Sequence, residues 1–240
     1  MLKLAVSGAC GRMGSRIIAL AKNDKELSVA VCLERKGHAK LASQIEGMSI
    51  TDDYSLVSGV DCVIEFTEPE ATLKNLETCL KYKRPMVIGT TGLKQESIAV
   101  INKAAGTIPI VLSVNMSVGV NLVFKVVKEL ANVLSDYEIK IIEAHHIHKK
   151  DAPSGTAKKI AQIIKEARGK AAEDIQSIRE DEIVGDHEII FDGQFDRVSL
   201  KHSAKSRDIF AQGALIAAKW VVSKECGLYT MADCLSANEE

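Results

Sequence analysis

The chain has 240 residues, of which 31 are basic and 32 acidic, for a formal net charge of −1. This length allows one or two domains with a substantial core, and the balanced charge gives no field that favours nucleic acid or membrane. Aromatic residues make up 4 %, too few for a base-stacking surface. The six cysteines form no C-x-x-C pair, no apolar run reaches ~18 residues and no signal peptide is seen, so a cytoplasmic protein with reduced cysteines is expected.

The first predicted elements are a strand over residues 2–7, a glycine-rich turn over 8–14 and a helix. Glycines allow a tight turn and close approach of the backbone to a pyrophosphate, which a helix N-terminus attracts. The spacing is G-x-x-G-x-x-G instead of the usual G-x-G-x-x-G, so the turn alone also fits a purely structural role. A second strand, over 27–33, ends at Glu34, where an acidic side chain would bind the adenosine ribose. A solvated strand-end charge is the alternative.

The rest of the first half alternates strands and helices after an irregular, polar stretch at residues 35–59. The predicted strands cover 60–66, 85–88 and 108–112, and the predicted helices 67–82 and 94–105. This alternation predicts a Rossmann-like, doubly wound parallel sheet. The Gly-Thr-Thr-Gly turn at 89–92 follows the C-terminal end of a strand, where parallel sheets bind ligands, so it is predicted to touch the nicotinamide half of a cofactor. An ordinary βα turn is equally compatible with the sequence.

The pattern changes at residues 113–117, and a smaller α+β domain with a mixed sheet is predicted to follow. Its helices are expected over 122–134 and 154–167, and its strands over 137–142, 188–192 and 197–202, with a polar loop over 168–184. A helix over 211–222 is expected to return to the first domain. The predicted domains are therefore 1–114, completed by 213–240, and 115–212.

The segment 143–157 reads E-A-H-H-I-H-K-K-D-A-P-S-G-T-A and has three interpretations. A metal site would use His145, His146 and His148, but an extended strand turns the first away from the other two and no fourth ligand is supplied, so no metal is expected. The histidines could instead be structural. In a catalytic loop, a histidine would donate a proton and a lysine would hold an anion. Ser154 would then cap a helix whose first amides, at Gly155 and Thr156, bind a carboxylate.

This segment resembles the signature E-x-H-H-x-x-K-x-D-A-P-S-G-T-A of the 4-hydroxy-tetrahydrodipicolinate reductase (dihydrodipicolinate reductase) family. Six further motifs follow the family's order and cover essentially the full chain. They are G-A-x-G-R-M-G at 8–14, I-x-F-T-x-P at 64–69, I-G-T-T-G at 88–92, N-x-S-V-G-V-N at 115–121, V-G-D-H at 184–187 and H-x-A-x-S-R-x-x-F-A-x-G-A at 202–214.

The resemblance implies an oxidoreductase of lysine and diaminopimelate biosynthesis that reduces a cyclic dicarboxylate to tetrahydrodipicolinate with NADH or NADPH and loss of water. It implies that His145 donates the proton and that Lys149 is a second donor or a carboxylate clamp. Substrate would be bound by His146 together with Ser154, Gly155 and Thr156. A homotetramer built through second-domain sheets is also implied, with domain closure that brings the nicotinamide to the loop.

The resemblance further implies a set of residues that line the cofactor: Gly8, Ala9, Cys10, Gly11, Arg12, Met13, Glu34, Arg35, Gly89, Thr90, Thr91, Ser113, Val114, Asn115 and Met116. Several positions depart from the family pattern: Cys10 stands where a small residue is common, Glu65 where aspartate is usual, Met116 where an aromatic is frequent, and Glu180-Asp181 where small residues are usual. Glu34 would repel a 2′-phosphate and Arg35 would bind it, so both cofactors are expected to be used.

Two other functions compete with this interpretation. Another two-domain nicotinamide-dependent amino-acid dehydrogenase would share the first domain but not the loop at 143–157. A catalytically silent, NAD-binding redox sensor would need an output module that the sequence lacks. A nucleic-acid or membrane partner is not expected. It is predicted neither by the two alternatives nor by any feature of the sequence.

Overall fold

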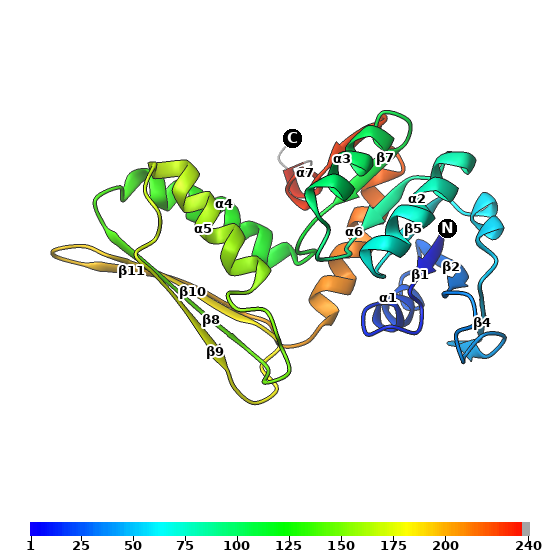
Figure 1. Ribbon diagram of the computed structural model, residues 1–240, viewed down its shortest axis with the longest axis horizontal. Helices are drawn as coiled ribbons and strands as arrows, with labels where there is room; N and C mark the ends of the chain where they lie inside the picture. The colour runs from blue at the N-terminus through cyan, green and yellow to red at the C-terminus, as the bar shows by residue number, and fades with distance from the viewer. Residues whose placement is uncertain (237–240) are drawn as a thin grey trace. The chain divides into compact units, whose positions relative to one another are not determined.

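The structure is a computed structural model in which residues 1–236 are described (Figure 1). The chain divides into two compact units. Unit 1 combines Met1–Ser117 with the segment that starts at Asp208, and unit 2 is Val118–Arg207. Both boundaries lie within a few residues of 114/115 and 212/213, where the sequence placed them.

Unit 1 contains an eight-stranded sheet in the order β12-β7-β6-β5-β1-β2-β4-β3. Its strands are β1 (Leu2–Ser7), β2 (Leu27–Leu33), β3 (Gln44–Ile45), β4 (Met48–Thr51), β5 (Cys62–Glu65), β6 (Met86–Ile88), β7 (Pro109–Leu112) and β12 (Gly227–Tyr229). All neighbours pair in parallel except the β3–β4 hairpin. Every residue of β5 and β6 is buried, as expected for central parallel strands covered on both faces.

Helices cover both faces of this sheet. They are α1 (Gly14–Ala21), α2 (Pro69–Tyr82), α3 (Gln95–Ala104), α6 (Asp208–Val221) and α7 (Met231–Ser236), with a 3₁₀ helix, η1, over Tyr54–Gly59. One core joins α1 to the small residues of α6, such as Ala214 and Ala218, and the other joins Leu76 of α2 to Ile101 of α3. The doubly wound sheet predicted from the sequence is therefore confirmed.

Unit 2 contains a four-stranded mixed sheet in the order β11-β10-β8-β9. Its strands are β8 (Glu138–His145), β9 (Asp174–Arg179), β10 (Asp186–Asp192) and β11 (Arg197–Ser203), and only the β8–β9 pair is parallel. The helices α4 (Val118–Val133) and α5 (Gly155–Arg168) lie side by side over one face of the sheet (Figure 1). Ile141, Phe191 and Ile160 are among the buried side chains of the core between them, which confirms the predicted α+β class of this unit.

Two predictions about unit 2 were wrong in detail. The stretch 168–184 was expected to be a loop, but it contains β9, which pairs with β8 from Lys140 opposite Asp174 to His145 opposite Arg179. Its sequence, Asp-Ile-Gln-Ser-Ile-Arg, has too few apolar residues to predict a strand. Strand β8 was expected to end at 142 but runs to His145, because it pairs on both sides.

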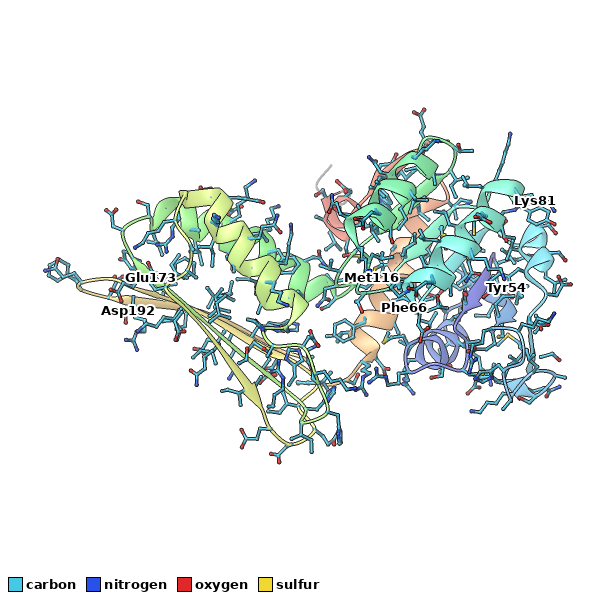
Figure 2. The ribbon with its side chains drawn as sticks, in the orientation of Figure 1. Tyr54, Phe66, Lys81, Met116, Glu173 and Asp192 are labelled. Atoms are coloured by element: carbon cyan, nitrogen blue, oxygen red, sulfur yellow. The ribbon has the colours of Figure 1, made fainter. Side chains whose placement is uncertain are left out.

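An ion pair between a buried guanidinium and a partly exposed carboxylate fixes the connection from α5 to β9. The carboxylate of Glu173, labelled in Figure 2, accepts hydrogen bonds from Arg168 at 3.1 Å and from the backbone N–H of Ile139 at 2.6 Å. The Arg168 side chain is 1 % exposed.

No helix in the described part of the chain is long and apolar enough to cross a bilayer.

The turn between β1 and α1 generates a stability prediction at Gly14. A Cβ on Gly14 would lie 2.1 Å from the carbonyl oxygen and 2.7 Å from the carbonyl carbon of Gly8. These are backbone atoms, so Gly14→Ala forces the turn to move, and we expect it to lower the free energy of unfolding by ~1–3 kcal/mol in urea denaturation.

Gly59→Ala is the matched control in the same unit. A Cβ on Gly59 meets no atom within 4 Å, so the substitution should change the free energy of unfolding by no more than ~0.5 kcal/mol. Equal losses in the two variants would show that the close approach at Gly14 does not limit stability.

Candidate active site

The end of β8 carries two ionisable side chains on the face that forms the core. Burial alternates along the strand, with Ile139, Ile141, Glu143 and His145 on the buried side. Because strand side chains have a period of two, Glu143 and His145 continue the row that the isoleucines begin. Glu143 is 0 % exposed and His145 is 8 % exposed, so the packing of unit 2 delivers a buried acid and a buried histidine to the strand's end.

The carboxylate of Glu143 is the centre of a hydrogen-bond network. Its Oε2 lies 2.5 Å from Nδ1 of His145. Arg179 donates to both carboxylate oxygens, at 2.8 and 3.1 Å, and the backbone N–H of Ser154 donates to Oε1 at 3.2 Å. The parallel register places Arg179 directly beside His145 on the neighbouring strand. A bidentate guanidinium is the partner best suited to hold a buried carboxylate in its ionised form.

The pKa values of the pair follow from these contacts. Burial raises the pKa of Glu143, but hydrogen bonds from Arg179, Ser177 and His145 outweigh it and lower the pKa to about 2. Burial lowers the pKa of His145 below its ordinary value, against the opposing effect of Glu143. At neutral pH the pair is therefore a carboxylate and a neutral imidazole, and the imidazole donates its Nδ1–H to the carboxylate.

The other nitrogen of His145, Nε2, faces Gly185. A Cβ at Gly185 would lie 3.0 Å from this nitrogen, so a glycine leaves the approach to Nε2 less obstructed than any other residue would. Since Nδ1 is occupied by Glu143, Nε2 is the atom through which His145 would exchange a proton with a bound molecule.

A second histidine packs against the first and ties it to α5. The rings of His187 and His145 meet edge to face with centroids 5.2 Å apart. Burial lowers the pKa of His187 to about 4, so this ring is neutral at physiological pH. Nε2 of His187 lies 3.2 Å from Oγ of Ser154, and the same Oγ accepts the N–H of Ala157 as the N-cap of α5. Because that oxygen accepts at the cap, its hydroxyl hydrogen is free to point to His187.

The loop that follows β8 is fastened by Arg179. This side chain also donates to the backbone oxygens of Lys149, at 3.3 Å, and Asp151, at 2.5 Å. Nζ of Lys149 is 2.7 Å from Asp151, so an incoming carboxylate would have to compete with this aspartate for the lysine. The first turn of α5 contains no acidic residue, and the positive end of the helix dipole is therefore not neutralised there.

The predicted substrate residues are only partly brought together. His145, Lys149 and Ser154 all belong to the network around Glu143 and Arg179, and Gly155 and Thr156 begin the helix that Ser154 caps. His146 does not join this network. It lies in the turn after β8, where the N–H of Lys149 donates to its backbone oxygen, and its ring centroid is 6.2 Å from that of His148.

The predicted cofactor residues of unit 1 meet at one edge of its sheet. Residues 8–13 connect β1 to α1, Glu34 and Arg35 follow β2, 89–91 follow β6 and 113–116 follow β7. These strands are parallel, so their carboxyl ends lie at the same edge. Glu34 is 8 % exposed, and its carboxylate accepts the N–H of Cys10 at 2.8 Å and that of Arg35 at 3.2 Å. The glycine-rich turn and the end of β2 are thus joined through one carboxylate.

The same edge holds a buried acid that sequence reasoning treated only as a departure from a pattern. Glu65, at the end of β5, is 0 % exposed, hydrogen-bonds to Thr67 and accepts from Asn75 at 3.0 Å. Asn75 also donates to Ser7 and to Tyr54, which Figure 2 labels. Burial raises the pKa of Glu65, although its hydrogen bonds oppose this. An acid at the end of an apolar strand buried on both faces was the available signal.

Glu143 and Arg179 were also missed as functional residues. The alternation that places Ile139 and Ile141 in the core would have placed Glu143 beside His145. No local signal marks Arg179, because its role depends on the parallel pairing of β9 with β8.

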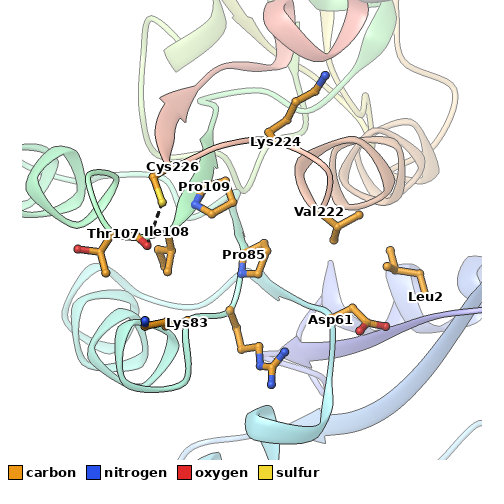
Figure 3. Close-up of a pocket in the computed structure, with 11 residues that line it drawn as sticks. Leu2, Asp61, Lys83, Pro85, Thr107, Ile108, Pro109, Val222, Lys224 and Cys226 are labelled. Carbon is orange, nitrogen blue, oxygen red and sulfur yellow. Dashed lines mark hydrogen bonds between the residues drawn. The ribbon is translucent and has the colours of Figure 1, made fainter.

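A shallow cavity of about 450 Å³ in unit 1 is not this site (Figure 3). Its lining includes Leu2, Asp61, Pro85 and Pro109, which lie at or just before the amino ends of β1, β5, β6 and β7. Parallel sheets bind ligands at the opposite, carboxyl edge, where the predicted cofactor residues lie.

Comparison with known proteins gives matches over both units. The family model for the dihydrodipicolinate reductase N-terminus matches residues 2–116, and that for the C-terminus matches 119–235. The chain is 41 % identical to 4-hydroxy-tetrahydrodipicolinate reductase from Geotalea uraniireducens and 40 % identical to that from Geobacter sulfurreducens, with 98 % of this chain and 99 % of each relative covered. The dipicolinate-bound dihydrodipicolinate reductase from Paenisporosarcina sp. TG-14 has the same fold, with a TM-score of 0.81 at 24 % identity over 96 % of this chain and 97 % of that one.

The network around Glu143 predicts a pH-dependent contribution to stability. The folded-state pKa of about 2 lies below the ordinary value of 4.5, so ionised Glu143 stabilises the folded state above pH ~4.5 and this stability is lost as the pH falls towards ~2. Glu143→Gln should lower the free energy of unfolding at pH 7 by up to ~3 kcal/mol. The difference from wild type should shrink in urea denaturations between pH 5 and the lowest pH at which both proteins fold.

Glu138→Gln, at the exposed start of the same strand, is the control, and it should leave the pH profile of stability unchanged. A loss in Glu143→Gln that stays constant with pH would mean that the ionisation of Glu143 does not stabilise the fold.

Proposed function

The chain belongs to the dihydrodipicolinate reductase family, and on this premise we propose that it reduces 4-hydroxy-tetrahydrodipicolinate to tetrahydrodipicolinate, with a reduced nicotinamide as hydride donor and loss of water. This makes it an oxidoreductase of lysine and diaminopimelate biosynthesis. The observation that supports a working site most directly is the network at the end of β8, where Glu143 holds Nδ1 of His145 and leaves Nε2 for proton transfer.

The residues at the carboxyl edge of unit 1 fit a dinucleotide. At Gly8 a Cβ would lie 2.5 Å from the backbone oxygen of Phe66, and at Gly14 it would strike Gly8, so the turn has the compactness that close approach of a pyrophosphate requires. Glu34 is buried, and its carboxylate accepts the backbone N–H groups of Cys10 and Arg35 and a hydrogen bond from the Cys10 thiol, which leaves lone pairs for ribose hydroxyls. A bound reduced nicotinamide would supply the hydride.

His145 is proposed as the proton donor, and its environment explains how it would be activated. In the free protein its pKa is lowered, so the ring is neutral at pH 7. A substrate with two carboxylates beside the ring would favour the protonated form. Glu143 would stabilise the resulting imidazolium through Nδ1, and Nε2 would donate the proton that accompanies hydride transfer.

Lys149 is proposed to bind a substrate carboxylate together with the start of α5. Its present partner, Asp151, lies two residues away in the same loop, so exchange of that carboxylate for one of the substrate keeps the lysine charge paired. Ser154, Gly155 and Thr156 would present the helix start to the anion. His146 is proposed as a further substrate contact from the turn. The homotetramer and the cytoplasmic location expected from the resemblance stay predictions.

His145→Ala tests the proposed reaction and its proton donor together. Wild-type protein coupled to the preceding synthase should oxidise NADH or NADPH only when the synthase product is formed. The variant should lose ~10²–10⁴-fold in kcat, the usual contribution of a general acid. Its affinity for NADH should be unchanged, because the proposed cofactor residues belong to unit 1.

The control is His148→Ala in the same loop, where the side chain is 74 % exposed, and it should retain wild-type turnover. Wild-type turnover in His145→Ala would remove this histidine from the mechanism, and no turnover of the synthase product by wild type would overturn the proposed reaction.

Arg35→Ala tests cofactor choice. Arg35 is exposed and directly follows Glu34, and its guanidinium is proposed to bind a 2′-phosphate that the carboxylate would otherwise repel. A hydrogen bond to a charged group contributes ~1.5–3 kcal/mol, so the substitution should lower kcat/KM for NADPH by roughly 10- to 150-fold and leave that for NADH nearly unchanged. Lys36→Ala, which removes the next exposed cation, should have little effect with either cofactor. Equal losses with NADH and NADPH in Arg35→Ala would show that Arg35 does not distinguish them.

A further inference from the structure

Three potential metal ligands lie together where β2 approaches the glycine-rich turn of unit 1. Among residues 1–236, the one group of three such side chains whose ligand atoms all lie within 4.8 Å of one another is Cys10, Glu34 and His38. Cys10 belongs to the turn after β1, Glu34 directly follows β2, and His38 lies in the polar segment after it. The proposed reaction uses neither the thiol of Cys10 nor the ring of His38.

Glu34 makes this group more than a chance cluster. Its side chain is nine-tenths buried, yet within the described part of the chain no lysine or arginine forms an ion pair with it. Its partners are the two backbone N–H groups of Cys10 and Arg35 and the thiol of Cys10, all of them neutral donors. A buried carboxylate held only by neutral donors leaves a negative potential uncompensated, which favours a cation at that point.

We propose that Cys10, Glu34 and His38 bind one thiophilic divalent cation, with Zn²⁺ as the representative ion, in the cofactor-free protein, and that the bound ion excludes the adenosine end of the cofactor. One thiolate and one carboxylate neutralise the charge of the ion, and the imidazole adds a neutral ligand. Sulfur and nitrogen ligands select zinc or cobalt over magnesium or calcium. Three protein ligands leave a fourth tetrahedral position for water.

The geometry requires only side-chain adjustment. Metal–ligand bonds of ~2.0–2.3 Å in a tetrahedron set the ligand atoms about 3.3–3.8 Å apart, against the present limit of 4.8 Å. Cys10 and His38 are both partly exposed and can rotate towards Glu34. Nδ1 of His38 now accepts the N–H of Lys40 at 3.2 Å. A metal bound at Nδ1 would replace this hydrogen bond directly. A metal bound at Nε2 would move the ring proton to Nδ1, so that Nδ1 could no longer accept. In either case the bond lost is a long one between residues two apart.

Exclusion of the cofactor follows from the shared carboxylate and rests on the proposed function. Glu34 is the residue proposed to accept hydrogen bonds from the ribose hydroxyls. When its carboxylate is bound to Zn²⁺ together with Cys10 and His38, it cannot also accept those hydrogen bonds. Zinc would therefore raise the apparent KM for NADH and NADPH without changing kcat at saturating cofactor.

The test is a titration of cofactor-free, chelator-treated protein with Co²⁺ and Zn²⁺. We expect one equivalent of Co²⁺ to bind with a thiolate-to-cobalt charge-transfer band, and NADH to remove that band. Cys10→Ala should abolish the band. His38→Gln should weaken binding by ~10-fold or more, since even the loss of an outer-shell partner of a metal ligand costs about that. Cys226→Ala is the control, because Cys226 is an exposed thiol at the amino end of β12, and it should leave the band intact.

Absence of Co²⁺ binding, or binding that survives both Cys10→Ala and His38→Gln, would overturn the metal site. A band that saturating NADH does not remove would overturn the exclusion. Reductase turnover measured in chelator-containing buffer separates this proposal from the proposed function. In that buffer the turnover of His38→Gln should equal that of wild type. A wild-type protein that binds Co²⁺ at this site but shows no reductase turnover would count against the reductase assignment alone.

Discussion

The organisation of unit 2 around its site depends on keeping one buried carboxylate ionised. Glu143 has no exposure to water, and an uncompensated charge in such a position would be strongly destabilising. Arg179 provides the compensation with two hydrogen bonds, and Ser154 adds a third from its backbone N–H. Each partner comes from a different element, so β8, β9 and the start of α5 are all fixed by the same two oxygen atoms.

Unit 1 contains a buried carboxylate at a strand end as well, and its environment has the opposite effect. Glu65 meets hydroxyl and amide groups in place of a guanidinium, and burial raises its pKa, whereas the pKa of Glu143 is lowered to about 2. The same type of side chain therefore has a raised pKa in one unit and a lowered pKa in the other. The acid with the lowered pKa is the one next to a histidine.

The sequence was informative wherever the signal is local. Alternating strands and helices predicted the doubly wound sheet, and the segment 143–157 located the start of α5. It failed where the signal is a pairing between distant residues. Strand β9 is polar and was taken for a loop, and the function of Arg179 follows only from its register opposite His145. Glu143 lay within the recognised segment, but its connection to Arg179, 36 residues later, has no sequence pattern of its own.

The spacing of that segment acquires a physical reason from the same carboxylate. Glu143 and His145 are two residues apart because side chains two apart share a strand face. The chain then turns, and the N–H of Ser154 returns to Glu143 while the hydroxyl of Ser154 caps α5. Arg179 holds the middle of the turn through the backbone oxygens of Lys149 and Asp151. The loop is thus closed at both ends on Glu143 and braced at its centre, so Lys149 and His145 keep a fixed relation while the imidazole stays neutral. If His145 is the proton donor, as proposed, the neutral imidazole would be a poor donor on its own, and a bound dicarboxylate would make it a good one by favouring its charged form. The proton would then be available when the substrate is present and withheld when it is absent.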